Sequence, residues 1–402
     1  MCKLMDVVSG LRLSTVVPGR LTDDNTIHEL RSIDLAMKLH YLNCLYFFKP
    51  EDADDNNNFT VAQLKLPMFS LLTAHPHVSG RIRRGDDERP CIKCNDCGVR
   101  IAEARSSRTV EEVARMNDQS VFDGLVYKME LGPDLGFSPL VALQFTWFKC
   151  GGLSIGLRWA HVLGDAFSAS AFVNTWANLF SHDPTAPVSV TGSLHDEAHQ
   201  LPSVSKQFHS AKRVNPVGNH WIVHSGNNLK MRTHSFHING KQVSQLRSKV
   251  GAEFPPFEVL SAILWKLLAK IRGKTEPRCV TICRRNPRFE EDHALSNSQI
   301  ISTLKASFSI MESEVGDLVK LISNAKVDEK LLIEKAVEEE NGKSDFIVYG
   351  AKLTFVDLKD MGMYKMKLKG QKLVMGLCSV DGVGEEGIVL IAPIEDGEEG
   401  CV

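Results

Sequence analysis

The stretch Leu153-Ser-Ile-Gly-Leu-Arg-Trp-Ala-His-Val-Leu-Gly-Asp165 decides how this sequence is interpreted. Its first seven residues alternate between apolar side chains and small or polar ones, which is the period of two expected for a half-buried strand. His161 continues the apolar face where that strand ends, and apolar residues at helical spacing begin at Phe167. Catalytic side chains often lie at such strand ends, because a rigid element aims them and a loop leaves them accessible.

The HxxxD pattern from His161 to Asp165 has two interpretations on the residues alone. A neutral imidazole at His161 can take a proton from a hydroxyl or thiol near neutral pH, which makes it a candidate general base. The alternative is structural. A histidine beside an apolar strand often belongs to the core, and Asp165 is well placed to cap the helix that follows. The pattern also occurs by chance, so the surrounding sequence has to decide.

The composition is that of an ordinary globular protein. The chain has 402 residues, which is enough for about two to three domains. It is 43% hydrophobic and 24% charged with a net charge of -2, so no basic excess points to nucleic acid. The N-terminus lacks an apolar signal core, and the longest apolar stretches, such as 140–148, are too short to span a bilayer. Any membrane association is therefore expected to depend on a partner or a surface.

Ten cysteines are scattered along the chain and are expected to be reduced thiols, because no secretory signal precedes them. In one cluster, Cys91, Cys94 and Cys97 have a spacing at which three soft ligands can bind zinc or an iron–sulfur cluster. A fourth ligand is not obvious, although His75 and His77 lie upstream. The alternative is a strand running into an Asn-Asp turn, and we expect no metal site here.

Helices and strands interleave along the chain, which predicts the α/β class. Residues 183–220 are rich in Pro, Ser, His and Asn with little apolar periodicity, and predict a linker. It would join an N-terminal lobe, 1–182, which carries HxxxD, to a C-terminal lobe, 221–402. Helices are expected near 32–40, 61–73, 110–116, 167–180, 242–250, 257–272 and 314–340. Strands are expected near 140–148, 153–159, 232–238, 346–356 and 387–392.

Several short segments, in this order, resemble the plant BAHD acyltransferase superfamily over nearly the whole chain. They are Leu13-Ser-Thr-Val-Val-Pro18, His77-Val-Ser-Gly-Arg81, Asn95-Asp-Cys-Gly98 with Glu103-Ala104, Cys150-Gly-Gly-Leu-Ser-Ile-Gly156, the HxxxD segment, Trp176-Ala177 and Phe257-Glu-Val-Leu-Ser-Ala-Ile-Leu-Trp265. Together they are far more specific than HxxxD alone.

This resemblance implies two lobes of similar topology, like those of chloramphenicol acetyltransferase, with a channel between them and the catalytic histidine midway. His161 would then deprotonate an acceptor hydroxyl or amine, which attacks the thioester carbonyl of an acyl-CoA. Asp165 would orient the turn while paired with an arginine, Arg284 or Arg285. No cofactor is expected, and acyl-CoA would enter as donor substrate or ligand.

The sequence departs from the family pattern in three places. Ala166 stands where the family has Gly, which can alter the turn. The second family signature, DFGWG, is missing, and Tyr364–Lys372 occupies its place with Lys367 roughly where the Asp would be. The chain stops ten residues after Ala392, in acidic 395–402, which suggests a natural truncation or a gene model cut short. The lysines of the second segment are expected to form a solvated strand in preference to a partner surface: Lys367, Lys369 and Lys372.

These departures resemble one branch of the family, the Eceriferum/Glossy wax proteins, which keep HxxxD and lack DFGWG. The shared strings are Ser32–Tyr41, Leu131–Leu140, Phe148–Leu153, Trp159–Ala169 and Ser344–Ala351. The branch implies an accessory protein acting with the 3-ketoacyl-CoA synthase of the fatty acid elongase, on the cytosolic face of the endoplasmic reticulum, in cuticular wax synthesis. The alternative is an acyl-CoA-dependent O-acyltransferase with His161 as general base.

Overall fold

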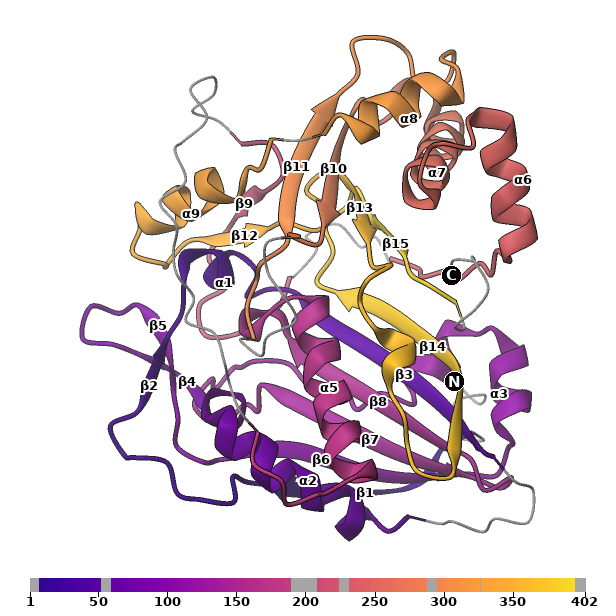
Figure 1. Cartoon of the computed structure of the whole chain (residues 1–402). Helices are drawn as coiled ribbons and strands as arrows, with labels where there is room; N and C mark the ends of the chain where they lie inside the picture. Colours follow the sequence, from indigo (N-terminus) through magenta and orange to yellow (C-terminus); the bar gives the residue numbers. More distant parts are fainter. Residues whose placement is uncertain are drawn as a thin grey trace.

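The computed structural model describes residues 7–51, 59–188, 208–223, 231–287, 295–325 and 327–394. Its largest element is a six-stranded mixed sheet with the spatial order β1-β6-β7-β8-β3-β14 (Figure 1). In chain order these strands are β1 (Ser9–Val16), β3 (Tyr41–Pro50), β6 (Val99–Ser106), β7 (Val141–Phe148), β8 (Leu153–Ala160) and β14 (Gln371–Asp381). Only the β6–β7 pair among these neighbours is parallel.

A second mixed sheet forms the core of the other lobe, with the order β11-β10-β13-β15. Its strands are β10 (Cys279–Arg284), β11 (Ile300–Lys305), β13 (Leu353–Asp357) and β15 (Ile388–Ile391). Helices α6 (Gly240–Val250), α7 (Pro256–Arg272) and α8 (Val315–Ser323) belong to this lobe (Figure 1). The two-lobed α/β architecture predicted from the family resemblance is confirmed.

Smaller elements complete the described chain. A three-stranded sheet has the order β2-β5-β4, and a two-stranded sheet pairs β12 with β9. The strands are β2 (Ile27–Glu29), β4 (Arg81–Arg84), β5 (Pro90–Lys93), β9 (Lys212–Val214) and β12 (Asp345–Ile347). The remaining α-helices are α1 (Ser32–Ala36), α2 (Val61–Ala74), α3 (Val110–Met116), α4 (Gln119–Asp123), α5 (Ala166–Ser181) and α9 (Lys330–Glu338).

Strand β8 is buried on both faces, which differs from the half-buried strand expected from its alternation. The face of Ile155, Leu157 and Trp159 belongs to the main apolar cluster with residues of α2 and α5. The opposite face is also covered, because the backbone around Leu125 crosses it. A Cβ at Gly156 would lie 2.1 Å from the Leu125 carbonyl oxygen. The small and polar residues of the strand therefore make room for a covering segment and do not face solvent.

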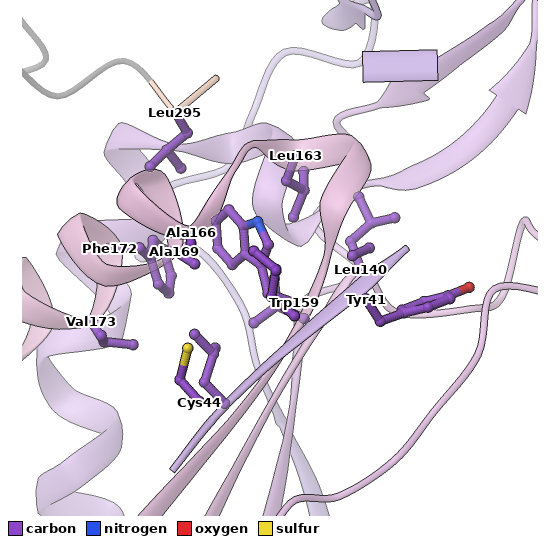
Figure 2. Packing of buried hydrophobic residues seen from close by; sticks show 14 of the residues in the cluster. Tyr41, Cys44, Leu140, Trp159, Leu163, Ala166, Ala169, Phe172, Val173 and Leu295 are labelled. Atoms are coloured by element: carbon purple, nitrogen blue, oxygen red, sulfur yellow. The ribbon is translucent and has the colours of Figure 1, made fainter. Parts of the chain in front are cut away.

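The tryptophan at the end of β8 fixes the start of the next helix. Figure 2 shows the Trp159 ring lying against the first turns of α5, near Ala166 and Phe172. The rings of Trp159 and Phe172 are 5.4 Å apart. The indole N–H donates to the carbonyl of Gly164 at 3.0 Å. The turn that carries HxxxD is thus attached to the core by both packing and a hydrogen bond.

The C-terminal half contributes β14 to the sheet of the N-terminal half. This strand pairs antiparallel with β3 along its whole length, from Gln371 opposite Pro50 to Asp381 opposite Tyr41. Buried Arg158 on β8 donates to Asn43 on β3 and forms an ion pair with Asp381 on β14. The pairing of β14 with β3 therefore joins the two halves of the chain. It was not among the strands expected from the sequence.

Most expected elements are confirmed, and several boundaries are wrong. The helices α2, α3, α5, α6 and α7 and the strands β7, β8 and β15 lie close to their expected positions. Residues 231–237 form no strand. The regions 314–340 and 346–356 are each broken, into α8 and α9 and into β12 and β13. The pieces have different neighbours: α8 packs on α7 and α9 on α1, whereas β12 pairs with β9 and β13 with β10. Residues 395–402 lie outside the described residues.

The predicted linker, 183–220, is described in part, with 189–207 outside the described residues. Its last part contains β9, which pairs with β12. Buried Glu329 fixes residues just before β9, accepting hydrogen bonds from the backbone N–H groups of His209 and Ser210. Among the described helices, none combines the length and apolar character needed to cross a bilayer.

Candidate functional site

The HxxxD turn links the end of β8 to the start of α5. After Ala160 the chain makes one 3-10 turn, His161–Leu163, and Gly164 then adopts φ 149°. A Cβ at Gly164 would lie 2.8 Å from the Cβ of Ser168 and 2.9 Å from the backbone nitrogen of Ser296. Glycine is therefore required here by conformation and by the close approach of the other half of the chain.

The Asp165 carboxylate accepts five hydrogen bonds, three of which come from the other half of the chain. One carboxylate oxygen accepts from the backbone N–H groups of Phe167 and Ser168, each at 3.1 Å, and so caps α5 as predicted. The other oxygen accepts from the backbone N–H groups of Ser298 and Gln299 at 2.9 and 3.1 Å, and from the Ser298 hydroxyl. A buried carboxylate needs several donors, and these come from both halves of the chain.

The predicted pairing of Asp165 with an arginine is wrong. Arg284 forms an ion pair with Glu258 at 3.1 Å and donates to the carbonyl of Ile322. The guanidinium of Arg285 lies over the ring of Phe167, 5.9 Å from its centroid. Backbone N–H groups of the segment before β11 take the place that the family resemblance assigns to arginine.

His161 is fully buried and hydrogen-bonded across the junction of the halves. Its Nε2 lies 3.1 Å from the hydroxyl of Tyr349, in the loop between β12 and β13. That hydroxyl also accepts a hydrogen bond of 2.6 Å from Nε2 of Gln299. The carbonyl of His161 accepts from the side chain of Asn297 at 2.9 Å. His161 Nδ1 lacks a hydrogen-bond partner among the described residues.

A second buried histidine, His40, bonds both to the HxxxD turn and to the loop that carries Tyr349. Its carbonyl accepts a 3.1 Å hydrogen bond from the backbone N–H of His161. Its Nε2 accepts from the backbone N–H groups of Val348 and Tyr349 at 3.0 and 3.3 Å. His40 lies just before β3, so it connects the HxxxD turn to the loop that carries Tyr349.

Burial keeps the groups of this site neutral. It lowers the pKa of His161 to about 4, an effect that the nearby Asp165 carboxylate opposes. Burial, with the neighbouring His161 ring, lowers the pKa of His40 to about 3. The pKa of Tyr349 is raised well above its usual value, again mainly by burial. At neutral pH the site therefore holds two uncharged imidazoles and a protonated phenol.

A small cavity lies where the family resemblance places a channel. Its volume is about 10 Å³, roughly the room for one water molecule. Both sheets contribute to its mostly apolar lining of Leu42, Cys44, Ala166, Tyr349, Val356, Leu358, Cys378, Ser379, Val380 and Leu390. A larger groove of about 780 Å³ lies along the edge of the large sheet, beside Arg12, Arg105 and Trp147, and is not lined by the HxxxD residues.

The cysteine cluster does not converge on one point. Cys91 and Cys94 are buried, whereas Cys97 is exposed. The upstream ring of His77 is stacked on that of His28, with centroids 4.4 Å apart. Among the described residues, no three His, Cys, Asp or Glu side chains are grouped so that they could hold a metal ion. The segment forms β5, as the alternative interpretation predicts, and continues as a loop over 94–98.

Sequence reasoning identified His161 and Asp165 but missed their neighbours. Tyr349, which contacts His161, lies 188 positions further along the chain, and Gln299, which contacts Tyr349, lies 138 positions further along. Two of the strings used for the branch resemblance, Ser32–Tyr41 and Ser344–Ala351, contain His40 and Tyr349. The presence of both residues in these strings was the signal available from the sequence.

Comparisons with known proteins agree with this architecture. A model of the Transferase family matches residues 8–361. The chain is 41% identical to "Protein ECERIFERUM 26" of Arabidopsis thaliana over 402 aligned positions, covering 98% of this chain and 91% of that protein. It is 39% identical to "Protein ECERIFERUM 2" of the same plant, covering 96% and 92%. Among solved structures, vinorine synthase has a TM-score of 0.67 at 16% identity, covering 98% of this chain and 94% of that one.

Proposed function

The chain belongs to the Transferase family, the plant BAHD acyltransferase superfamily, and from that premise we propose that it is an accessory protein of very-long-chain fatty acid elongation in cuticular wax synthesis. The near full-length similarity to ECERIFERUM proteins, at about 40% identity, carries this proposal. Sequence similarity to a hydroxycinnamoyltransferase of Narcissus pseudonarcissus is weaker, at 25% identity, and covers 62% of the chain.

The geometry of the HxxxD site supports a role that does not depend on acyl transfer. His161 is inaccessible to solvent, and its Nε2 is hydrogen-bonded to Tyr349. The adjacent cavity has room for about one water molecule, so acyl transfer at His161 would require the junction of the lobes to open. Asp165, in contrast, uses both carboxylate oxygens to join the two halves of the chain. Retention of HxxxD is explained by this structural role.

The partner that this proposal requires is a 3-ketoacyl-CoA synthase, the condensing enzyme of the elongase. Association with that enzyme would bring the protein to the cytosolic face of the endoplasmic reticulum. A long-chain acyl-CoA is the proposed ligand, because each methylene that leaves water contributes about 0.8 kcal/mol. The junction of the lobes, with its apolar lining, would have to open before such a chain could enter.

A second candidate function, acyl-CoA-dependent O-acyltransferase, is favoured by one observation. Nε2 of His161 lies 3.1 Å from a hydroxyl group, so an imidazole protonated on Nδ1 presents Nε2 to that hydroxyl as a proton acceptor, as a general base would. The two functions can be told apart at His161, because only the transferase requires its imidazole to accept a proton.

The decisive experiment compares wild type with His161→Gln in rescue of a wax-deficient plant. Equal recovery of long-chain wax at equal protein levels is expected for the accessory function. Recovery by wild type alone, with the variant accumulating normally, would establish the transferase. A parallel measurement in yeast co-expresses each form with a condensing enzyme. Unchanged acyl chain lengths with wild type would dispose of the accessory function.

A further inference from the structure

A hydroxyl already occupies the position beside His161 that an acyl acceptor would need. The Tyr349 oxygen accepts a hydrogen bond from the Gln299 amide at 2.6 Å and lies 3.1 Å from Nε2 of His161. When His161 carries its ring proton on Nδ1, the phenolic proton points to Nε2, the remaining neighbour of that oxygen. This is the geometry in which a general base meets the hydroxyl of a substrate.

The tyrosine is fixed in this position by its backbone as well as its side chain. Its N–H and that of Val348 donate to His40, and its carbonyl accepts from the N–H of Gly384 at 2.9 Å. The phenol is therefore a built part of the loop between β12 and β13. It cannot leave His161 by a simple rotation of its side chain, because its ring is enclosed and its hydroxyl has two partners.

We propose that Tyr349 is the resident occupant of the acceptor subsite of the HxxxD site, and that this subsite has the shape and hydrogen-bonding pattern of a phenol. Gln299 supplies the donor that holds the oxygen, and His161 supplies the acceptor for its proton. This inference goes beyond the proposed role in elongation. It assigns a ligand class, the phenols, to a site that the protein keeps filled with its own side chain.

The test removes the resident ring and offers a free one to the full-length protein. Tyr349→Ala is titrated with p-cresol and with toluene, which differ by the hydroxyl group. The matched control is Phe145→Ala, which vacates a buried ring in the core beside Trp147 and Trp176, away from any described histidine contact. We expect the ratio of p-cresol to toluene affinity to be about tenfold higher in Tyr349→Ala than in the control, as for one regained hydrogen bond.

The His161→Ala/Tyr349→Ala double variant should lose that preference. Equal ratios in Tyr349→Ala and Phe145→Ala would overturn the proposal, since the phenol of Tyr349 would then be ordinary core packing. These outcomes are independent of wax rescue, so a failure here leaves the elongation role standing.

A second variant keeps the site filled and so avoids any failure to fold. Tyr349→Phe retains the ring and removes only the hydroxyl. Its readout is the nitrogen NMR spectrum of His161 at neutral pH. In wild type, Nε2 should show the shift of an unprotonated nitrogen that accepts a hydrogen bond, and in Tyr349→Phe that signal should move downfield. An unchanged signal, or a wild-type Nε2 that carries the proton, would contradict the assignment.

Discussion

The two segments that correspond to the family signatures, 161–165 and 364–372, use their side chains in opposite ways. In the first, the polar side chains are buried, and Asp165 bonds to residues 298 and 299 of the other half of the chain. In the second, the lysines point outward while Met366 and Leu368 are buried between them. One segment depends on the identity of each polar group, whereas the other needs only an alternation of apolar and polar residues.

The contrast explains how one signature can persist while the other changes. Asp165 accepts a hydrogen bond from the backbone N–H of Gln299. The Gln299 side chain donates to the Tyr349 hydroxyl, and that hydroxyl is hydrogen-bonded to Nε2 of His161. His161 and Asp165 belong to the same turn, so the four residues form a closed ring of contacts across the junction of the lobes. Losing any member leaves a buried polar group without its partner, which is costly even where no reaction takes place.

Among changes to the polar residues of the two segments, the largest expected effect is the loss of stability in Asp165→Asn. The replacement removes the charge and turns an N–H₂ group toward backbone N–H donors, so at least two buried hydrogen bonds are lost. We expect the free energy of unfolding to fall by about 3 kcal/mol. Denaturant titration at neutral pH measures the change. The control is the exposed Asp360→Asn, expected to stay within about 0.5 kcal/mol. If both variants change stability equally, the proposed link between the lobes is wrong.

The next effect is a pH dependence that comes from the buried imidazoles. The pKa of His161 is lowered to about 4 and that of His40 to about 3, below the value of roughly 6.5 in the unfolded chain. The unfolded state therefore binds more protons below pH 6.5. Each histidine should then remove about 1.4 kcal/mol of stability per pH unit as the pH falls from there toward its folded pKa.

Denaturant titrations between about pH 6 and pH 5 can separate the contribution of His161 from the others. In His161→Gln the slope of unfolding free energy against pH should be smaller by about 1.4 kcal/mol per unit. The exposed His182→Gln, at the end of α5, serves as the control and should leave the slope as in wild type. An unaltered slope in the His161 variant would mean that its imidazole is not held neutral by the fold.

The same contrast shows what sequence reasoning can reach. The position of the HxxxD turn was predictable, because β8, the capping carboxylate of Asp165 and α5 are adjacent in the chain. The neighbours of His161 were not, since Tyr349 and Gln299 lie far along the chain and arrive through the pairing of the lobes. Strand β14 was missed for the same reason. Its pairing partner, β3, lies more than 300 positions earlier in the chain, so the sheet that it joins could not be predicted from its own residues.

The smallest expected effect belongs to the second segment, where two adjacent positions provide an internal comparison. Lys367 is exposed, and its backbone carbonyl accepts a hydrogen bond of 2.9 Å from the Ser181 hydroxyl. Leu368 is 3% exposed and belongs to the main apolar cluster. Lys367→Ala should change the unfolding free energy by less than about 0.5 kcal/mol, because the backbone bond survives. Leu368→Ala should cost about 2–5 kcal/mol.

Elongation assays then separate a solvated surface from a docking surface. If Lys367 is only solvated, co-expression of Lys367→Ala with a condensing enzyme should give the same acyl chain lengths as wild type. A loss of long products at unchanged stability would instead make this segment part of the partner interface. In that case a binding surface would stand in place of the second signature. The HxxxD turn would then hold the lobes together, while segment 364–372 would recognise another protein.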